Sequence, residues 1–442
     1  MTATTRERRA SAPPPRPLQS GTPVGDAVRI LVEGEPPVRI TTYEGTAIGS
    51  PSAPIGLHVR SERGLSYLLT APGDLGLSRA YVAGDLQLVG VHPGDPYEAL
   101  RALTQVKIHR PSANEALAIV RRLGWEGVRP PAPPPEEAPA RWRRTADGLR
   151  HSRGRDAHAV QHHYDVSNAF YAHVLGPSMT YTCAVYRDPA DSLEDAQAAK
   201  YELVAGKLGL RPGMRLLDVG CGWGGMVRHA AREHGVRALG VTLSREQADW
   251  AQAAIVRDGL TDLAEVRCMD YRDVPAEQFD AVSSIGLTEH IGLGHYAAYF
   301  AGLRDRLRPG GRLLNHCITR ADSTMPARPG PFLDRYVFPD GELSCVGRVV
   351  TAIHDAGLEV QHHENLRMHY ARTLEAWCGN LVRNWDACVA EVGIGRARVW
   401  GLYMAGSRLS FEQNAIQLHQ VLATRTGPDG GSGFPLRPDW SA

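Results

Sequence analysis

Ten residues near the middle of the chain form the pattern best suited to chemistry. The stretch LLDVGCGWGG (216–225) is an apolar run that ends in Asp218 and then breaks into glycines. A short strand over 214–219 followed by a helix over 226–233 brings backbone amides and a helix N-terminus to the turn between them. Such a turn can hold a polar or anionic ligand, so the spacing predicts a nucleotide-type site.

The residues around this turn narrow the choice of ligand. The spacing Gly220-x-Gly222-x-x-Gly225 satisfies the dinucleotide fingerprint, which is a weak signal alone. A dinucleotide site also needs an acid at the end of the second strand to bind the ribose, but the strand predicted over 237–242 ends in Thr242. The acid here precedes the first glycine, which favours a different cofactor. A turn that serves strand-to-helix packing only is the remaining alternative.

The elements that position these residues alternate between strand and helix, which predicts an α/β fold with a doubly wound, Rossmann-like parallel sheet. Further strands are predicted over 264–268, 279–285 and 312–319, and a helix over 244–258 whose Ser244-x-x-Gln247 matches a capping box. Other candidate residues lie in or just after these strands, where such folds place their sites: Asp270, Tyr271, Glu289 and His316.

A different pattern precedes this domain. Residues 1–24 are rich in Arg and Pro and are expected to be disordered. Residues 25–124 predict a small α+β domain, with strands over 38–43 and 55–59 and helices over 75–81 and 96–107. A proline-rich and basic linker is predicted over 125–150, and a larger second domain over 151–442. The stretch 141–155, across the end of the linker, is basic and contains Trp142, which suits an anionic lipid surface or a solvated linker edge equally.

The C-terminal part is less regular. Residues 320–341 predict a loop-rich insertion, whereas 370–384 and 397–422 predict amphipathic helices. These helices could wall an apolar channel or could be ordinary covering helices.

Composition limits the function classes. With 442 residues and a net charge of +1, the chain has no overall attraction to nucleic acid. Its seven cysteines show no metal-ligand spacing and fit a reducing cytoplasm. No apolar run is long enough to span a membrane and no signal peptide opens the chain. Lysine occurs only at 107, 200 and 207, which we interpret as nucleotide-composition bias.

Five motifs together resemble the cyclopropane fatty acid synthase family of S-adenosylmethionine-dependent lipid methyltransferases, over about 161–424. The motifs are HHYDVSN (162–168), SMTYTC (178–183), LDVGCGWGG (217–225), GVTLSREQ (240–247) and RYVFPDG (335–341). In addition, LSRAYVAGDL (77–86) resembles the N-terminal domain of phospholipid-acting members.

The resemblance implies that a methyl group passes from S-adenosylmethionine to a cis double bond of oleoyl phospholipid, and that a bound bicarbonate ion deprotonates the resulting carbocation. The implied bicarbonate cage consists of Cys183, Glu289, His316, the backbone of Ile318, and Tyr370. The implied cofactor site consists of Tyr181, Thr182, Asp218, Gly220, Gly222, Trp223, Gly225, Thr242, Gln247, Asp270 and Tyr271. Thr242 and Gln247 would bind the ribose, and Asp270 and Tyr271 would flank the adenine.

Several of these residues have simpler explanations. Cys183 could be a small buried hydrophobe, His316 a hydrogen-bonded core histidine, and Gln247 a helix-capping residue. Glu289 is harder to explain structurally, because an uncompensated carboxylate after an apolar strand is costly.

The product depends on the residue before Glu289. Cyclopropane-forming members usually carry an aromatic residue there, whereas this chain has Thr288. The segment 286–292 looks more like members linked to tuberculostearic acid, which form a 10-methylene chain that a separate reductase converts to a methyl branch. We expect Thr288 to open volume beside Glu289 and favour the methylene product, with cyclopropane as the alternative.

Two other functions stay open, namely a non-catalytic lipid-binding protein and a methyltransferase for a small soluble acceptor. We expect a cytoplasmic protein attached peripherally to the inner face of the membrane, with phospholipid acyl chains as partners and no nucleic acid. Homodimer formation stays open.

Overall fold

The computed structural model describes residues 22–107, 112–138, 167–275, 278–339 and 341–440. The chain divides into two compact units, of which one contains Met1–Val91 and Arg101–Ala132 and the other His92–Leu100 and Pro133–Ala442. The sequence analysis placed all of 25–124 in the first domain, whereas this division assigns 92–100 to the second unit. The basic stretch 141–155 and most of the tail 1–24 lie outside the described residues, although Pro23 and Val24 already belong to a helix.

The first unit is an α+β fold, as predicted. Its four-stranded sheet has the order β2-β1-β3-β4, with β1 and β3 parallel and the other pairs antiparallel. The elements are α1 (Pro23–Leu31), β1 (Arg39–Thr42), β2 (Ala47–Ile48), β3 (Gly56–Val59), α2 (Glu62–Thr70), α3 (Asp74–Val82), β4 (Leu86–Val89) and α5 (Ala113–Gly127). Hydroxyl side chains of Thr22 and Ser61 cap α1 and α2 by accepting backbone amide hydrogen bonds. Helix α4 (Tyr97–Leu103) crosses the division between the units.

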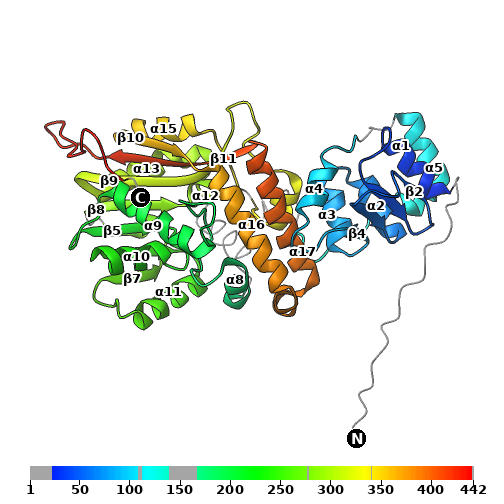
Figure 1. Cartoon of the computed structure of the whole chain (residues 1–442). Coiled ribbons are helices and arrows are strands. Elements are labelled where there is room, and N and C mark those ends of the chain that lie inside the picture. Colours follow the sequence, from blue (N-terminus) through cyan, green and yellow to red (C-terminus); the bar gives the residue numbers. More distant parts are fainter. Residues whose placement is uncertain (1–21, 108–111, 139–166, 276–277, 340, 441–442) are drawn as a thin grey trace, which may run out of the picture. The chain divides into compact units, whose positions relative to one another are not determined.

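The second unit is built on a seven-stranded sheet of order β10-β11-β9-β8-β5-β6-β7 (Figure 1). The strands are β5 (Arg215–Val219), β6 (Arg237–Thr242), β7 (Ala264–Cys268), β8 (Phe279–Ile285), β9 (Leu307–Arg320), β10 (Glu359–Asn365) and β11 (Ile416–Thr424). The five strands from β9 to β7 are parallel, which confirms the predicted α/β class and the strands predicted from periodicity.

Helices cover both faces of this sheet, as a doubly wound fold requires (Figure 1). One apolar core joins a sheet face to α9 (Leu193–Leu208), α10 (Gly225–His234) and α11 (Arg245–Arg257). A second core joins the other face to α13 (Tyr296–Arg306) and α15 (Val346–Asp355). Short turns complete the crossovers: η2 (Tyr271–Asp273), α12 (Thr288–Ile291) and η3 (Leu293–His295).

The C-terminal part corrects two expectations. The helix predicted over 397–422 is wrong beyond Glu412, where α17 (Trp385–Glu412) ends. The chain then reverses through Asn414, whose φ is +58°, and continues into β11. The sheet is not wholly parallel, since β11 runs antiparallel to both β9 and β10. The polar strand β10 was not predicted, and its sequence EVQHHEN shows why, because it has no apolar alternation.

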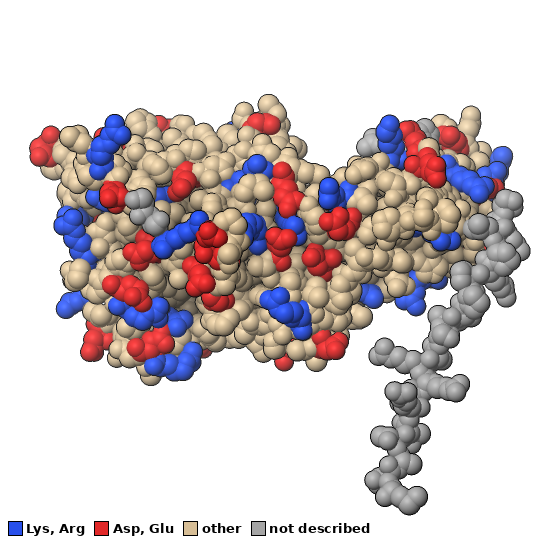
Figure 2. All heavy atoms as spheres, viewed as in Figure 1, with Lys and Arg blue, Asp and Glu red and all other residues tan. Residues whose placement is uncertain are grey.

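Three further helices stand beside the sheet (Figure 1). Helix α8 (Asn168–Leu175) packs against α16 (Arg367–Arg383) and α17. The insertion predicted to be loop-rich over 320–341 contains the short helix α14 (Pro331–Tyr336). Among the described helices, none is both long and apolar enough to cross a membrane. Figure 2 shows acidic and basic side chains interspersed over the face in view.

Candidate active site

The predicted glycine turn lies between β5 and α10 and is held by backbone hydrogen bonds. The amides of Gly220 and Cys221 both donate to the Val241 carbonyl of β6, at 2.9 and 3.0 Å. Gly220 and Gly222 have φ of +73° and +54°, a region that side chains rarely adopt. A Cβ on Gly225 would lie 1.9 Å from the hydroxyl of Tyr201, whereas a Cβ on Gly222 would meet no heavy atom within 4 Å. The absence of a side chain at Gly225 therefore lets Tyr201 pack against the turn, whereas its absence at Gly222 leaves the space above the turn open.

That open space belongs to a pocket of about 540 Å³, including its open mouth. Eight residues predicted to bind the cofactor line it: Tyr181, Thr182, Asp218, Gly220, Gly222, Trp223, Gly225 and Gln247. The indole of Trp223 is fixed by a hydrogen bond from its Nε1 to Asn168 Oδ1 of 2.8 Å. The turn and the pocket therefore bring together residues that are 66 positions apart in sequence.

A carboxyl and an amine, those of Asp218 and Lys200, lie buried in this pocket. Asp218 accepts a 2.6 Å hydrogen bond from the Ser283 hydroxyl, and burial raises the pKa of its carboxyl to about 7. Lys200 of α9 donates to Thr182 Oγ1 at 3.0 Å and lies 3.8 Å from the centre of the Tyr201 ring. Burial lowers the pKa of Lys200 to about 7. Each charge stabilises the other, so this end of the pocket can present two opposite charges or two neutral groups to a ligand.

Thr242 and Gln247 bond each other rather than standing apart. The Thr242 hydroxyl donates to Gln247 Oε1 at 2.8 Å and accepts from the Ser244 amide at 3.2 Å. The predicted capping box is half confirmed, because Ser244 Oγ accepts from the Gln247 amide while the Gln247 side chain turns to Thr242. Of the two, Gln247 lines the pocket.

The residues expected to flank adenine follow β7. The Asp270 carboxylate accepts from the amide and the guanidinium of Arg272, with an Nε contact of 2.8 Å. Tyr271 stacks edge-on against Tyr299, with ring centres 5.2 Å apart. The Met269 amide ties this segment to the Thr242 carbonyl at 2.9 Å. Both residues thus follow a strand end beside the pocket, and neither is among the residues that line it.

A second pocket, of about 850 Å³ including its open mouth, adjoins the first. The two share Tyr181, Thr182 and Gly286 as lining residues. The rest of its wall is mainly apolar and aromatic and comes from β9, α14, α16, α17, β11 and the segment before α15: Ile318, Leu333, Phe338, Leu343, Tyr370, Leu374, Tyr403, Phe411 and Ile416. Three members of the predicted cage line this pocket, namely Glu289, Ile318 and Tyr370.

Glu289 is a buried acidic group of this apolar pocket, which Glu342 also lines. Its Oε1 accepts a 2.7 Å hydrogen bond from the Ile318 amide of β9. Its Oε2 is buried and has no hydrogen-bond partner among the described residues. Burial raises the pKa of the carboxyl to about 7, against the pull of the Ile318 amide. A group with this pKa can exchange a proton near neutral pH.

We expect the stability of the protein to report this shifted carboxyl. The folded state keeps the proton on Glu289 up to about pH 7, whereas the unfolded chain loses it near 4.5. Between these values the unfolded chain ionises while the folded state keeps its proton, so the free energy of unfolding of the wild type falls as pH rises. Glu289→Gln has no such group, so its free energy of unfolding should gain about 1–3 kcal/mol on the wild type between pH 4.5 and 8. Urea unfolding at several pH values measures this, and a constant difference would contradict it.

His316 is oriented by a chain of buried groups that starts at Lys207. The Lys207 ammonium, fully buried on α9, donates to Glu364 and to Gln420 Oε1, the latter at 2.6 Å. An ammonium can only donate, so the amide of Gln420 must present its Nε2 to His316 Nδ1, 3.2 Å away. Nδ1 therefore accepts, and the ring proton sits on Nε2. Burial lowers the pKa of His316 well below its usual value, so the ring is neutral.

We expect Gln420→Met to lower the turnover number about tenfold, the cost of one lost hydrogen bond of about 1.4 kcal/mol, by releasing the His316 tautomer. S-adenosylmethionine affinity should be unchanged. Gln417→Met, on the same strand but bonded to Asn414 at 2.8 Å, is the matched control. Steady-state kinetics with both variants measures the effect, and equal turnover in the two would contradict the orienting role.

Three residues differ from their expected environment. His316 is not among the lining residues of either pocket, although its Nε2 is buried without a partner among the described residues. The Cys183 thiol is buried, donates to the Ala184 carbonyl at 3.1 Å, and has its pKa raised by burial; it is not among the lining residues of either pocket. Thr288 is also buried, and its hydroxyl donates to Asn315 Oδ1 at 2.6 Å. Since Thr288 does not line the apolar pocket, the expectation that it opens volume beside Glu289 is wrong.

Sequence reasoning missed Lys200, Tyr201, Tyr403 and Lys207. The signal for the lysines was present, because two of only three lysines in the chain lie seven positions apart on one helix, which places them on the same face. The aromatic residues gave no such signal, since an aromatic side chain on an amphipathic helix is usually core.

Comparison with known proteins agrees with this geometry. The family described as mycolic acid cyclopropane synthetase matches residues 151–421. The chain is 60% identical over 408 residues to a probable fatty acid methyltransferase of Mycobacterium tuberculosis, covering 92% of this chain and 95% of the relative. It is 35% identical over 268 residues to the cyclopropane-fatty-acyl-phospholipid synthase of Escherichia coli strain K12, covering 61% and 68%.

Among solved structures, a mycolic acid cyclopropane synthase in complex with SAH and CTAB superposes with a TM-score of 0.57. It is 31% identical and covers 60% of this chain and 97% of its own. The glycine turn, the Rossmann-like sheet and these matches lead to one conclusion: the chain belongs to the mycolic acid cyclopropane synthetase family of S-adenosylmethionine-dependent methyltransferases.

Proposed function

We propose that this enzyme transfers the methyl group of S-adenosylmethionine to the cis double bond of an unsaturated acyl chain, such as oleoyl, in a phospholipid. One observation carries the proposal. A polar pocket at the glycine turn and an apolar pocket with a buried carboxyl share the walls Tyr181, Thr182 and Gly286. A donor in the first pocket and an acyl chain in the second would meet at these walls.

The residues of the apolar pocket suit the chemistry of an alkene. S-adenosylmethionine supplies an electrophilic sulfonium methyl group. As the π electrons of the alkene take up the methyl group, the carbon–sulfur bond breaks and positive charge develops on the neighbouring carbon. The rings of Tyr370, Tyr403 and Phe411 line this pocket, and a desolvated aromatic face stabilises a cation by up to about 2 kcal/mol. The apolar walls exclude water, which would otherwise trap the cation as an alcohol.

Two buried polar atoms support the bicarbonate ion that the family resemblance implies, one on Glu289 in the apolar pocket and one on His316, which does not line that pocket. Glu289 Oε2 and His316 Nε2 are both buried without a partner among the described residues. His316 and Ile318 are two positions apart on β9, so they face the same side of the sheet. Bicarbonate bound between these groups would supply a base. His316 Nε2–H can donate to such an anion, and Glu289, held by the Ile318 amide, can exchange a proton with it.

The acceptor is inferred from the apolar pocket and from the relatives. The relative at 60% identity matches 92% of this chain and therefore extends into the N-terminal unit. Its name gives a fatty acid as the acceptor, and that of the Escherichia coli relative gives a fatty acyl phospholipid. We place the enzyme at the inner membrane surface, where it would reach such acyl chains peripherally.

We propose the 10-methylene acyl chain as the product, on the resemblance of segment 286–292 to methylene-forming members, with cyclopropane as the alternative. A separate reductase would then convert the methylene group to a methyl branch. We do not assign this choice to Thr288, because its hydroxyl bonds Asn315 and its side chain does not line the pocket.

We expect Thr288→Val to leave the product ratio unchanged and to lower the free energy of unfolding by about 1–3 kcal/mol, since Asn315 Oδ1 loses its buried donor. Gas chromatography of the fatty acids and urea unfolding measure the two effects. A changed ratio of methylene to cyclopropane products would show that Thr288 acts on the cation after all.

The proposal is tested by incubating the enzyme with S-adenosylmethionine carrying a labelled methyl group and with dioleoyl phospholipid vesicles, followed by mass analysis of the released fatty acids. We expect one labelled carbon added per oleoyl chain. Label that stays in the cofactor would favour a lipid-binding protein without catalysis, and label in a small soluble acceptor from a cell extract would favour another methyltransferase.

A further inference from the structure

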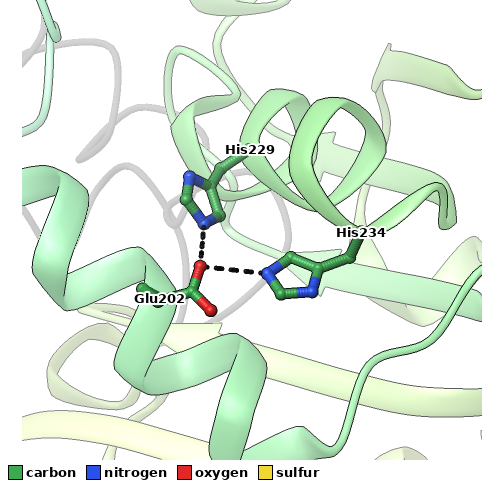
Figure 3. A group of neighbouring side chains, drawn as sticks. All are labelled: Glu202, His229 and His234. Atoms are coloured by element: carbon green, nitrogen blue, oxygen red, sulfur yellow. Dashed lines mark hydrogen bonds and ion pairs between the residues drawn. The ribbon is translucent and has the colours of Figure 1, made fainter. Parts of the chain in front are cut away.

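Outside both pockets, three potential metal ligands converge between α9 and α10 (Figure 3). Glu202 comes from α9, and His229 and His234 come from α10. The carboxylate Oε2 of Glu202 lies 3.2 Å from His229 Nε2 and 3.1 Å from His234 Nε2. All three ligand atoms lie within 4.8 Å of one another. Figure 3 shows both imidazole rings directing a nitrogen at the same carboxylate oxygen.

These distances match a coordination shell. With metal–ligand bonds of about 2.0–2.1 Å, neighbouring ligand atoms of a tetrahedral zinc site lie about 3.3 Å apart. Two imidazoles and one carboxylate are a known donor set for Zn²⁺ and related divalent transition ions, and they leave a fourth position for water. The side chain of Glu202 is 44% exposed and that of His234 19%, so an ion can enter from solvent.

We propose that Glu202, His229 and His234 bind a divalent transition-metal ion of the Zn²⁺ class, which joins α9 to α10. Sequence spacing did not reveal this site, because its members lie 27 and 5 positions apart on two helices. None of the three residues lines the cofactor pocket or the apolar pocket, but His229 contacts a residue of the cofactor pocket wall. The His229 ring packs 5.6 Å from that of Tyr201, which lines the cofactor pocket next to Gly225. Bound metal would therefore stiffen the wall against which the glycine turn packs.

The test uses the full chain without a histidine tag, stripped with a chelator and titrated with zinc chloride by calorimetry. We expect one ion per chain with micromolar or tighter affinity and a rise of several degrees in melting temperature. Co²⁺ in place of Zn²⁺ should give a d–d absorption spectrum without a cobalt–thiolate charge-transfer band, because no cysteine belongs to the site. The zinc titration and the cobalt spectrum both use the wild-type protein, and neither depends on methyl transfer activity.

Glu202→Gln and His234→Asn should each weaken binding at least tenfold. His354→Asn, which changes an exposed histidine on α15, is the matched control and should bind as the wild type does. Absence of zinc binding to the wild type would overturn the proposal, as would unchanged affinity in both site variants. A cobalt–thiolate band would also overturn it, because the ion would then sit at a cysteine.

Discussion

The turnover number of Glu289→Gln is expected to fall at least about a hundredfold, the range seen when a positioned proton-transfer group is lost. Glutamine matches the shape of the carboxyl and its Oε1 can still accept from the Ile318 amide. What it lacks is the ability to ionise and to take up a proton at the second oxygen, which is buried in the apolar pocket. The developing cation would then lose both a counter-charge and a proton acceptor.

The measurement is steady-state methyl transfer to oleoyl phospholipid at pH 8, where Glu289 with a pKa of about 7 is mostly ionised. Affinity for S-adenosylmethionine, measured separately by calorimetry, should stay within a factor of about two, because Glu289 does not line the cofactor pocket. Glu265→Gln, which neutralises an exposed carboxylate on β7, controls for the change in net charge. Normal turnover in Glu289→Gln would remove this residue from the chemistry.

The second large effect concerns Gly222, where a valine should weaken S-adenosylmethionine binding at least about a hundredfold, or about 2.7 kcal/mol. A Cβ at this position points into the open space of the cofactor pocket, where no protein atom lies within 4 Å. The added side chain would fill volume that the ligand needs. It would also be strained at a φ of +54°, a cost of about 1–2 kcal/mol that falls on stability.

A matched glycine separates these two causes. Gly213 also has a positive φ, +82°, and a Cβ there would likewise meet nothing within 4 Å, but it precedes β5 and does not line the pocket. Gly213→Val should therefore lose stability while keeping cofactor affinity. Calorimetric titration of both variants makes the comparison. Equal loss of affinity in the two would mean that backbone strain, and not occupied space, disturbs binding.

How far the sequence predicted the site depended on whether the signal was local. The glycine turn, the strand that feeds it and Asp218 are contiguous, so their types and spacing were sufficient. Glu289 was found because a carboxylate directly after an apolar strand needs an explanation. Thr242 and Gln247 were predicted as ribose ligands, of which Gln247 lines the pocket, but their mutual hydrogen bond was not predicted, since the partner of a side chain depends on the geometry of the whole turn.

The features that were missed depend on contacts between distant segments. The scarcity of lysine was interpreted as nucleotide bias, yet Lys200 and Lys207 are both buried and act on Thr182 and on the Gln420–His316 pair. The orientation of Thr288 away from the pocket could not be read from its position next to Glu289, because consecutive residues in a helical turn point in different directions. The reversal at Asn414 was hidden because apolar spacing continued across it.

The antiparallel strand β11 has a consequence for how the enzyme is made. It pairs with β9 along nine residues, and it brings Gln420 to His316 across a separation of 104 positions. During synthesis the parallel strands and the glycine turn emerge long before residues 416–424 leave the ribosome. The cofactor pocket can therefore assemble while the chain is still growing, whereas His316 acquires its partner only near the end. A ribosome-stalled chain that lacks β11 should therefore contain the glycine turn but lack the contact between Gln420 and His316.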